Sequence, residues 1–347
     1  MVAPLNWGLG HATRDIPIIK LLLENGAEVV LAGDGAGLKL LRGEFPDLPY
    51  YELPGWNITY PENGSFAWHL IKQTGKVLRA IRLEHQAVET IVREERIDVV
   101  ISDNRLGAFS KSARNIVISH QIFLESPIIK RFLNWNNTRL LKKFDEVWVV
   151  DVPGDHNLSG RLSHRKKIPF KHRYLGIISR FSGAQKEPAD EVEVLAIVSG
   201  PEPQRTLFEK ELLPELEKMG KKTVVLLGKP GEPKGSWQQG KLTLYNHLTG
   251  VELAHLFAAA ETVISRDGYT TVMDLVVLNK KAVLVPTPGQ TEQEYLADYY
   301  QEKGWYVIQR QGKIDLEKAF RQLPLSQIPT VSKENTLEKA VKSLFKS

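Results

Sequence analysis

Residues Val263–Tyr300, VISRDGYTTVMDLVVLNKKAVLVPTPGQTEQEYLADYY, carry the signals of strand, glycine turn, helix, strand, proline-rich loop and helix with almost no spacer. A short apolar run ends at Ser265, Gly268 permits a sharp turn, and apolar residues recur at helical spacing over Thr270–Leu278. The apolar run Ala282–Val285 predicts a second strand. The stretch is therefore a βαβα unit with two parallel strands.

In a parallel sheet, the loops that follow the strands open at the carboxyl edge, where ligands of open α/β sheets bind. We therefore expect Arg266–Thr271 and Pro286–Gln293 to line one pocket. The polar residues of these two loops are candidates for function.

The length of the chain indicates more than one domain. With 347 residues, it exceeds the size at which single cores usually stop growing. We place a linker in the polar stretch Ser182–Asp190, which contains Gly183 and Pro188. This divides the chain into residues 1–181, residues 182–332 and a C-terminal helix over 333–347.

The composition is that of an ordinary soluble globular protein, with 42% hydrophobic and 25% charged residues. No apolar run approaches the ~20 residues of a membrane-spanning helix. Met1 leads directly into the strand-like Val2–Leu5, so we expect no signal peptide. The chain has Cys 0, which excludes disulfides and thiolate chemistry and permits a cytoplasmic location. We expect the protein to be cytoplasmic.

The net charge of +5 is unevenly distributed, because no Asp or Glu occurs between His156 and Lys186. Such a basic stretch suits anionic lipid, phosphate or nucleic acid, but a solvated loop is the commoner explanation. Nucleic acid is disfavoured because only Phe170 and Tyr174 are interleaved with the basic residues. A helix predicted over Phe66–Arg96 either packs on a sheet or offers a basic amphipathic surface at the inner face of a membrane.

Strands and helices alternate through both halves of the chain, which predicts two doubly wound parallel sheets with helices on both faces. The first half begins with a strand at Val2–Leu5, and the second restarts at Val192–Val198. We predict a long exposed loop for Lys229–Gly240, which is rich in Gly, Pro and Lys.

Polar residues follow three strands of the first half. The loop after the first strand contains Gly8, Gly10 and His11, an arrangement that lets a ligand approach the backbone. Asp103 and His120 each follow a later strand. His11 is either a general base, since imidazole titrates near neutrality, or a cap of the following helix.

Two further sets of candidates lie in the second half. Ser199, Gly200 and Arg205 stand between its first strand and first helix, where a helix N-terminus favours an anion. Taken alone, that loop is better explained as a plain tight turn, and the acidic Glu202 argues against an anion. Asp274 lies two turns into the helix after Gly268, where its carboxylate suits ribose hydroxyls, unless it is only a surface acid.

Together, Asn6–Arg14, Ser199–Arg205 and Val263–Ala297 resemble segments of the GT-B glycosyltransferases, specifically the MurG-like (family 28) UDP-sugar transferases. The Ser265–Thr271 stretch resembles the family's Ser-Arg-x-Gly-x-x-Thr turn beside the donor phosphates. The resemblance implies two Rossmann-like α/β domains that face a cleft. Residues 1–181 would then receive the acceptor, residues 182–332 would bind the nucleotide sugar, and the C-terminal helix would cross back to the first domain.

The resemblance also implies roles for individual residues. The catalytic base would come from His11, Asp103 or His120, the last standing where the family has His-Glu-Gln. Asp274 would hold the ribose although it is one methylene shorter than the family's glutamate. The implied donor-binding residues are Ser199, Gly200, Arg205, His247, Leu248, Ser265, Arg266, Gly268, Thr270, Thr271, Asp274, Gln290, Glu292 and Gln293.

The activity implied is transfer of a sugar from a UDP-sugar, such as a UDP-N-acetylhexosamine, to an acceptor that is lipid-linked or a glycan, with inversion. Neither a metal nor a cofactor is expected, because helix N-termini and basic side chains would neutralise the diphosphate and no Asp-x-Asp motif occurs. Two alternatives remain open: a nucleotide-sugar hydrolase or epimerase of the same fold, and a nucleotide-sugar binding protein without activity.

Overall fold

The computed structural model describes residues 1–56, 74–125, 130–165, 167–182, 192–229, 231–248, 250–332, 334 and 336–345. The chain divides into two compact units. The first is built from the described parts of Met1–Thr59, Ala67–Arg180 and Val331–Ser347, and the second from those of Phe181–Thr330. Each unit contains one seven-stranded sheet.

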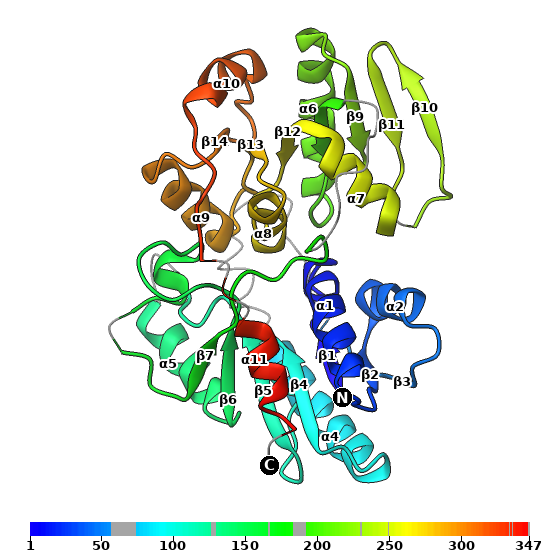
Figure 1. The fold of residues 1–347 in the computed structure, drawn as a ribbon, viewed down its shortest axis with the longest axis vertical. Helices are drawn as coiled ribbons and strands as arrows, with labels where there is room; N and C mark the ends of the chain where they lie inside the picture. The colour runs from blue at the N-terminus through cyan, green and yellow to red at the C-terminus, as the bar shows by residue number, and fades with distance from the viewer. Residues whose placement is uncertain are drawn as a thin grey trace. The chain divides into compact units, whose positions relative to one another are not determined.

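The sheet of the first unit has the order β3-β2-β1-β4-β5-β6-β7, and all of its strands are parallel (Figure 1). The strands are β1 (Val2–Pro4), β2 (Leu31–Gly33), β3 (Tyr50–Glu52), β4 (Val99–Asp103), β5 (Arg114–Ser119), β6 (Glu146–Val149) and β7 (His172–Tyr174). The helices are α1 (Gly10–Glu24), α2 (Gly35–Glu44), α4 (Thr74–Glu94), α5 (Lys130–Leu141) and α11 (Thr336–Lys342).

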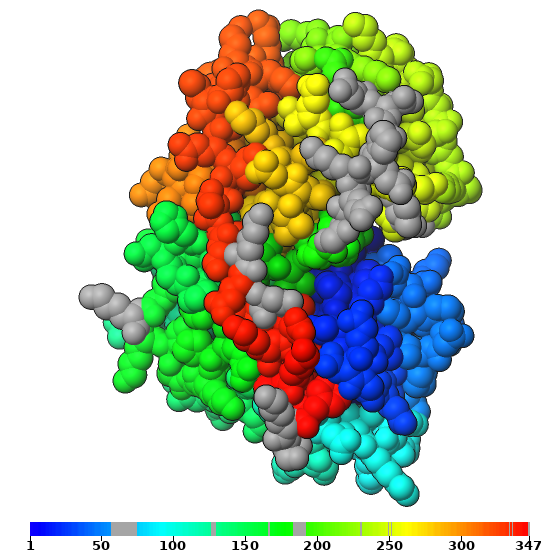
Figure 2. Space-filling model, in the orientation of Figure 1, coloured from blue at the N-terminus to red at the C-terminus, as the bar shows by residue number. Residues whose placement is uncertain are grey.

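The central strands of this sheet are buried on both faces, as parallel strands covered by helices must be. One core cluster joins β1 to the inner face of α4 through Ala3, Val88 and Val92. A second joins β5 and β6 to Leu141 at the end of α5. The helix α11 lies against α1, so residues from distant parts of the sequence complete this unit (Figures 1 and 2).

The sheet of the second unit has the order β10-β11-β9-β8-β12-β13-β14. Its strands are β8 (Val192–Ile197), β9 (Thr223–Leu226), β10 (Ser236–Gln239), β11 (Leu242–Tyr245), β12 (Ala260–Ser265), β13 (Lys281–Leu284) and β14 (Val307–Ile308). The helices are α6 (Gln204–Met219), α7 (Gly250–Ala259), α8 (Tyr269–Val277), α9 (Thr291–Glu302) and α10 (Leu316–Gln322). The predicted βαβα unit is β12-α8-β13-α9, and its two strands are parallel.

The structure corrects two expectations. Part of the predicted loop Lys229–Gly240 is strand β10, which pairs antiparallel with β11 and leaves all four of its residues exposed. An edge strand of this kind buries no side chains, so it lacks the apolar pattern that identifies the other strands. Strand β7 was likewise not expected, because its sequence His-Arg-Tyr is polar. The predicted linker falls almost entirely outside the described residues.

Candidate functional site

The three candidate bases of the first unit come together at the carboxyl edge of its sheet. His11 is the second residue of α1, Asp103 is the last residue of β4, and His120 directly follows β5. These elements meet because β4 pairs with β1, which leads into α1, and with β5. His11 Nδ1 lies 2.9 Å from Asp103 Oδ1.

Arg14, one turn further along α1, connects all three residues. Its Nε donates to Asp103 Oδ2 at 2.5 Å, and its Nη2 donates to Oδ1 of the same carboxylate. Its Nη1 lies 3.2 Å from His120 Nδ1, and its Nη2 lies 2.8 Å from His11 Nδ1. The guanidinium is 1% exposed, and therefore this network is internal and held in one geometry.

The charges within this network set the protonation of His11. Burial would raise the pKa of Asp103, but Arg14 and His11 outweigh it and hold that pKa below its usual value. Burial lowers the pKa of His11 below 6.5, Arg14 lowers it further, and Asp103 opposes both. Nδ1 of His11 lies near Asp103 Oδ1, which only accepts hydrogen bonds, and near Arg14 Nη2, which only donates them, so the two contacts favour opposite tautomers. We assign the proton of neutral His11 to Nδ1, where it faces the carboxylate, and Arg14 Nη2 then donates to Asp103 Oδ1 rather than to His11. The lone pair is then on Nε2, which a general base requires.

Asp15 is a further acid at this site. It is completely buried, and burial followed by the charge of Asp103 raises its pKa well above 3.8. Burial therefore favours the protonated form of Asp15, whereas Arg14 and His11 favour the ionised form of Asp103. Neither Arg14 nor Asp15 was singled out from the sequence, because their burial is visible only in the folded chain.

The glycine loop leads directly into this network. Gly8 has a φ of +76°, in the left-handed region that favours glycine, and Gly10 is the first residue of α1. A side chain at position 8 would therefore strain the turn that presents His11.

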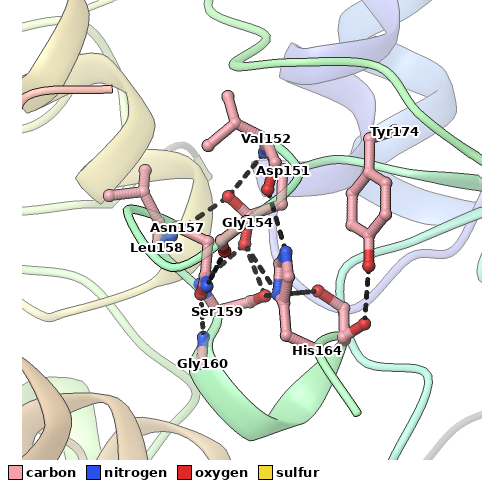
Figure 3. Close-up of polar contacts among 10 residues, drawn as sticks. Asp151, Val152, Gly154, Asn157, Leu158, Ser159, Gly160, His164 and Tyr174 are labelled. Carbon is pink, nitrogen blue, oxygen red and sulfur yellow. Dashed lines mark hydrogen bonds and ion pairs between the residues drawn. The ribbon is translucent and has the colours of Figure 1, made fainter. Parts of the chain in front are cut away.

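A second polar network follows β6 at the same edge of the sheet, and it contains two serines, a histidine and an aspartate (Figure 3). The carboxylate of Asp151 accepts the backbone N–H groups of residues 152, 158 and 159 and the hydroxyl of Ser159. His164 places Nε2 2.8 Å from the carbonyl of Val152 and Nδ1 3.0 Å from the hydroxyl of Ser163. Both serines are buried and all of these groups are engaged, so the network holds the loop rather than presenting a nucleophile.

In the second unit, three loops meet at the carboxyl ends of the adjacent strands β8, β12 and β13. Gly200 follows β8 with a φ of +116°, and a Cβ placed on it would lie 3.9 Å from Thr287 Oγ1 and 4.0 Å from Arg266 Nε. Both of these atoms are buried and have no hydrogen-bond partner among the described residues. Two unused donors therefore converge beside an open backbone, which suits a phosphate oxygen.

The remaining nitrogens of Arg266 tie the loops together. Nη1 donates to the carbonyls of Val285 and Pro286 at 3.2 and 3.0 Å, and Nη2 donates to the carbonyl of Gln204 at 3.1 Å. The guanidinium carbon also lies 4.1 Å from the centre of the Phe208 ring. Burial lowers the pKa of Arg266 to about 10, so the side chain stays charged at neutral pH. Only its Nε–H is left for a ligand.

Asp267 adjoins this cluster, and it belongs to the Arg266–Thr271 loop that was expected to line the pocket, although no role of its own was predicted for it. It is fully buried, and both carboxyl oxygens have no hydrogen-bond partner among the described residues. Burial raises its pKa well above 3.8, and the nearby charge of Glu292 raises it further. Both effects favour the neutral carboxyl, which repels an anion less than a carboxylate does.

The other predicted donor residues occupy the same edge. Ser265 ends β12, and Thr270, Thr271 and Asp274 follow on α8, with Asp274 3% exposed. The carbonyl of the Gln293 side chain accepts the N–H of Thr287 at 2.8 Å, which leaves its amide group for other contacts. Gln290 precedes α9, and Glu292 lies in its first turn. His247 and Leu248 follow β11, which β9 separates from β8.

Two expectations for this site need correction. Arg205 donates to Glu202 and to Glu209, each at 2.5 Å, so its charge is neutralised within the loop and α6 rather than left for a phosphate. Gly268 has a φ of −55°, which any residue adopts. The turn therefore does not demand glycine, and the missing side chain instead leaves the start of α8 uncovered.

The basic stretch after His156 is partly paired in the folded chain. Glu146, which is 2% exposed, lies 3.1 Å from Arg173 and 3.9 Å from Lys171. Arg165 lies 3.4 Å from Glu125. Acids that are distant in sequence therefore offset part of the charge.

Among the described residues, no three His, Asp or Glu side chains are grouped so that they could hold a metal ion. No helix in the described ranges is both long and apolar enough to span a bilayer.

Residues 213–344 match the model of the glycosyltransferase family 28 C-terminal domain. A protein of Lachnoclostridium phytofermentans is 25% identical over 314 residues, which cover 87% of this chain and 83% of that protein. Its name is UDP-N-acetylglucosamine--N-acetylmuramyl-(pentapeptide) pyrophosphoryl-undecaprenol N-acetylglucosamine transferase.

Solved structures share the fold of the whole chain. MurG of Acinetobacter baumannii has a TM-score of 0.60 at 14% identity, covering 100% of this chain and 99% of that one. The glycosyltransferase SnogD from Streptomyces nogalater has a TM-score of 0.63 at 15% identity, covering 100% and 98%. The likeness at these identities is one of fold, and it confirms the predicted GT-B class.

Proposed function

We propose that the donor is a UDP-sugar and that His11 is the catalytic base. These roles are assigned in a chain that is a glycosyltransferase of the GT-B fold with a family 28 C-terminal domain. The observation that carries this proposal is the contact of His11 with an ionised Asp103, both fixed by Arg14. A neutral imidazole that exposes Nε2 can accept a proton from an acceptor hydroxyl.

In this reaction, Nε2 of His11 removes the proton of the acceptor hydroxyl while its oxygen attacks the anomeric carbon. The bond from that carbon to the diphosphate oxygen breaks, and UDP leaves with the electron pair. Attack opposite the leaving group inverts the anomeric centre. Asp103 stabilises the imidazolium that forms, because its ionised carboxylate accepts a hydrogen bond from the Nδ1–H group.

The second unit would bind the donor. Gly200, Arg266 Nε and Thr287 would surround the diphosphate, and the uncovered start of α8 adds the positive end of a helix. Asp274, buried on α8, would accept ribose hydroxyls, and Glu292 with the amide of Gln293 would bind the sugar. Arg205 is left out of this assignment because of its two ion pairs.

UDP-N-acetylhexosamines are the first donors to test, because UDP-N-acetylglucosamine is the donor in the name of the curated relative. That name also contains a pyrophosphoryl-undecaprenol acceptor. We therefore place a lipid-linked acceptor ahead of a soluble glycan.

Thermal unfolding with a panel of uridine, guanosine and thymidine nucleotides and their sugars tests the donor. A ligand at 100 times its Kd adds ~2.7 kcal/mol to the free energy of unfolding, which gives a readable shift. UDP and one UDP-sugar should raise Tm, and no shift with any uridine nucleotide would overturn the donor assignment. UDP release without any acceptor would indicate a hydrolase instead of a transferase.

A further inference from the structure

The side chain of Gln311, in the loop that follows β14, contacts the guanidinium of Arg266. Its oxygen accepts a hydrogen bond from Nη2 of Arg266 at 2.5 Å, although 45 positions separate the two residues. Its nitrogen donates to the side-chain oxygen of Gln204 at 3.2 Å. The loops after β8, β13 and β14 therefore all contact a guanidinium that comes from the loop after β12.

The charge of Arg266 fixes the orientation of both amides. A guanidinium only donates hydrogen bonds, so the atom of Gln311 that faces it must be the oxygen. The nitrogen of Gln311 then faces Gln204, and the atom of Gln204 that meets this nitrogen must also be an oxygen. The contacts form a chain with one direction, so neither amide can turn over without losing a hydrogen bond.

The loop that carries Gln311 is held in place independently of Arg266. Glu211 of α6 accepts the N–H of Gly312 with its two oxygens, at 2.9 and 2.8 Å. It also accepts the N–H of Ile314 at 3.0 Å. Gln311 therefore meets Arg266 from a backbone that is fixed immediately after it, so its side chain can restrict where the guanidinium lies.

The Nε–H group of Arg266 adjoins the contact with Gln311. In a guanidinium, Nε–H and one N–H of Nη2 point the same way, as in Arg14, where these two nitrogens hold the two oxygens of Asp103. Nη2 of Arg266 has its partners in Gln204 and Gln311, whereas Nε is buried and has no hydrogen-bond partner among the described residues. An arginine that only linked loops would have all of its buried donors satisfied. The unsatisfied Nε–H therefore indicates a ligand atom as its partner.

We propose that Gln311 is a positioning residue of the donor site, which holds Arg266 so that its Nε–H points at an oxygen of the donor's diphosphate. This role rests on the proposed donor site and adds the loop after β14 to it. A neutral amide suits the role, because it accepts from Nη2 without cancelling the charge of the guanidinium. A carboxylate at this position would neutralise Arg266, as Glu202 and Glu209 neutralise Arg205.

Calorimetric titration of the full chain with nucleoside diphosphates and their nucleosides tests the proposal, because only the diphosphates would meet Arg266. Gln311→Met removes both hydrogen bonds of the amide at nearly constant size. Its affinity for UDP should fall by roughly tenfold, while its affinity for uridine should stay within about twofold of the wild type. Gln311→Glu keeps an acceptor for Nη2 but adds a negative charge, so its affinity for UDP should fall further than that of Gln311→Met. A role in stability alone predicts the reverse order, since a glutamate can pair with Arg266.

Gln309→Met is the matched control. Gln309 lies close by in the chain, and its side-chain oxygen accepts the N–H of Asp315 at 3.0 Å, but it is not a hydrogen-bond partner of Arg266. This variant should lower Tm and leave the ratio of the affinities for UDP and uridine unchanged. The Nε–H signal of Arg266 in NMR spectra, assigned from its loss in Arg266→Lys, gives a second measurement. UDP should shift this signal in the wild type and shift it less in Gln311→Met.

The proposal is overturned if both variants at position 311 bind UDP like the wild type, or if they lose affinity for UDP and uridine equally. A wild type that binds guanosine or thymidine diphosphate instead of UDP would refute the UDP assignment alone. The same variants would then test Gln311 with that diphosphate and its nucleoside. A wild type that binds none of these diphosphates would overturn both the donor site and the role of Gln311.

Discussion

Nδ1 of His11 lies 2.9 Å from Oδ1 of Asp103, although 92 positions separate the two residues in the sequence. Strand β4 pairs with β1 and so brings the carboxylate beside the start of α1. Arg14 then holds both carboxylate oxygens, which leaves the imidazole a single favourable orientation.

Replacement of His11 should abolish most of the transfer activity. His11→Ala removes the proposed base, and general-base catalysis contributes typically ~10²–10⁴-fold to the rate. Turnover of donor and acceptor measures the effect, with the exposed His156→Ala as the control. Turnover within a few-fold of the wild type would show that another group takes the proton.

The pH dependence of kcat/KM should reflect the lowered pKa of His11. The base acts in its neutral form, so the rate should fall only as the pH drops through a value below 6.5. Arg14→Gln removes a positive charge that lowers this pKa, and therefore the acidic limb should move to higher pH. NMR titration of the His11 ring in both proteins measures the same shift without activity. An unchanged pKa in Arg14→Gln would contradict the electrostatic role of Arg14.

Thr287→Val should separate ligand binding from stability. The hydroxyl of Thr287 has no hydrogen-bond partner among the described residues, so its loss should leave Tm of the free protein unchanged or higher. If it donates to a diphosphate oxygen, affinity for UDP should fall by roughly tenfold or more. Calorimetric titration measures the affinity, and Thr243→Val on β11 serves as the control. Equal affinity in wild type and Thr287→Val would remove Thr287 from the donor site.

Arg205→Gln should have the opposite effect. Arg205 is paired with Glu202 and Glu209 and also donates to the carbonyl of Leu227, so its loss should lower Tm. The affinity for UDP should change little, because the guanidinium is already neutralised. A large loss of affinity at constant Tm would restore Arg205 as a phosphate ligand.

Asp15→Asn should stabilise the protein increasingly as pH rises. Folding raises the pKa of Asp15 well above the 3.8 of the unfolded chain, so between these two pKa values the folded wild type binds more protons than the unfolded chain. The free energy of unfolding therefore falls with rising pH up to the folded pKa, by at most ~1.4 kcal/mol per pH unit from this group. Asn does not titrate, so urea unfolding at several pH values should show a widening difference. A difference in the free energy of unfolding that does not change with pH would show that the pKa of Asp15 is not raised in the folded protein.

The sequence predicts most of this fold because parallel strands buried on both faces are apolar throughout. It also places Asp103 and His120 at the carboxyl edge of the sheet, where parallel strands end. The contacts that join them to His11 through Arg14 are seen only in the structure. Strand β10 was not predicted because all of its side chains are exposed, so its sequence lacks the apolar pattern of a buried strand.

The role of Arg14 and the buried, unpaired state of Asp267 and Thr287 escape prediction for a different reason. Whether a polar side chain is buried, and whether its partners satisfy it, depends on residues that are distant in sequence. The same dependence explains Arg205. Its partners Glu202 and Glu209 are close to it in sequence, but they form ion pairs with it only when the loop is folded.

The packing of α11 against α1 has a consequence for the order in which the chain is made. The ribosome produces α1 first and α11 only after all of Phe181–Thr330, which contains the whole sheet of the second unit. The first unit must therefore wait for the C-terminal segment with part of α1 uncovered. The unit whose synthesis begins first is therefore complete only after translation has reached α11.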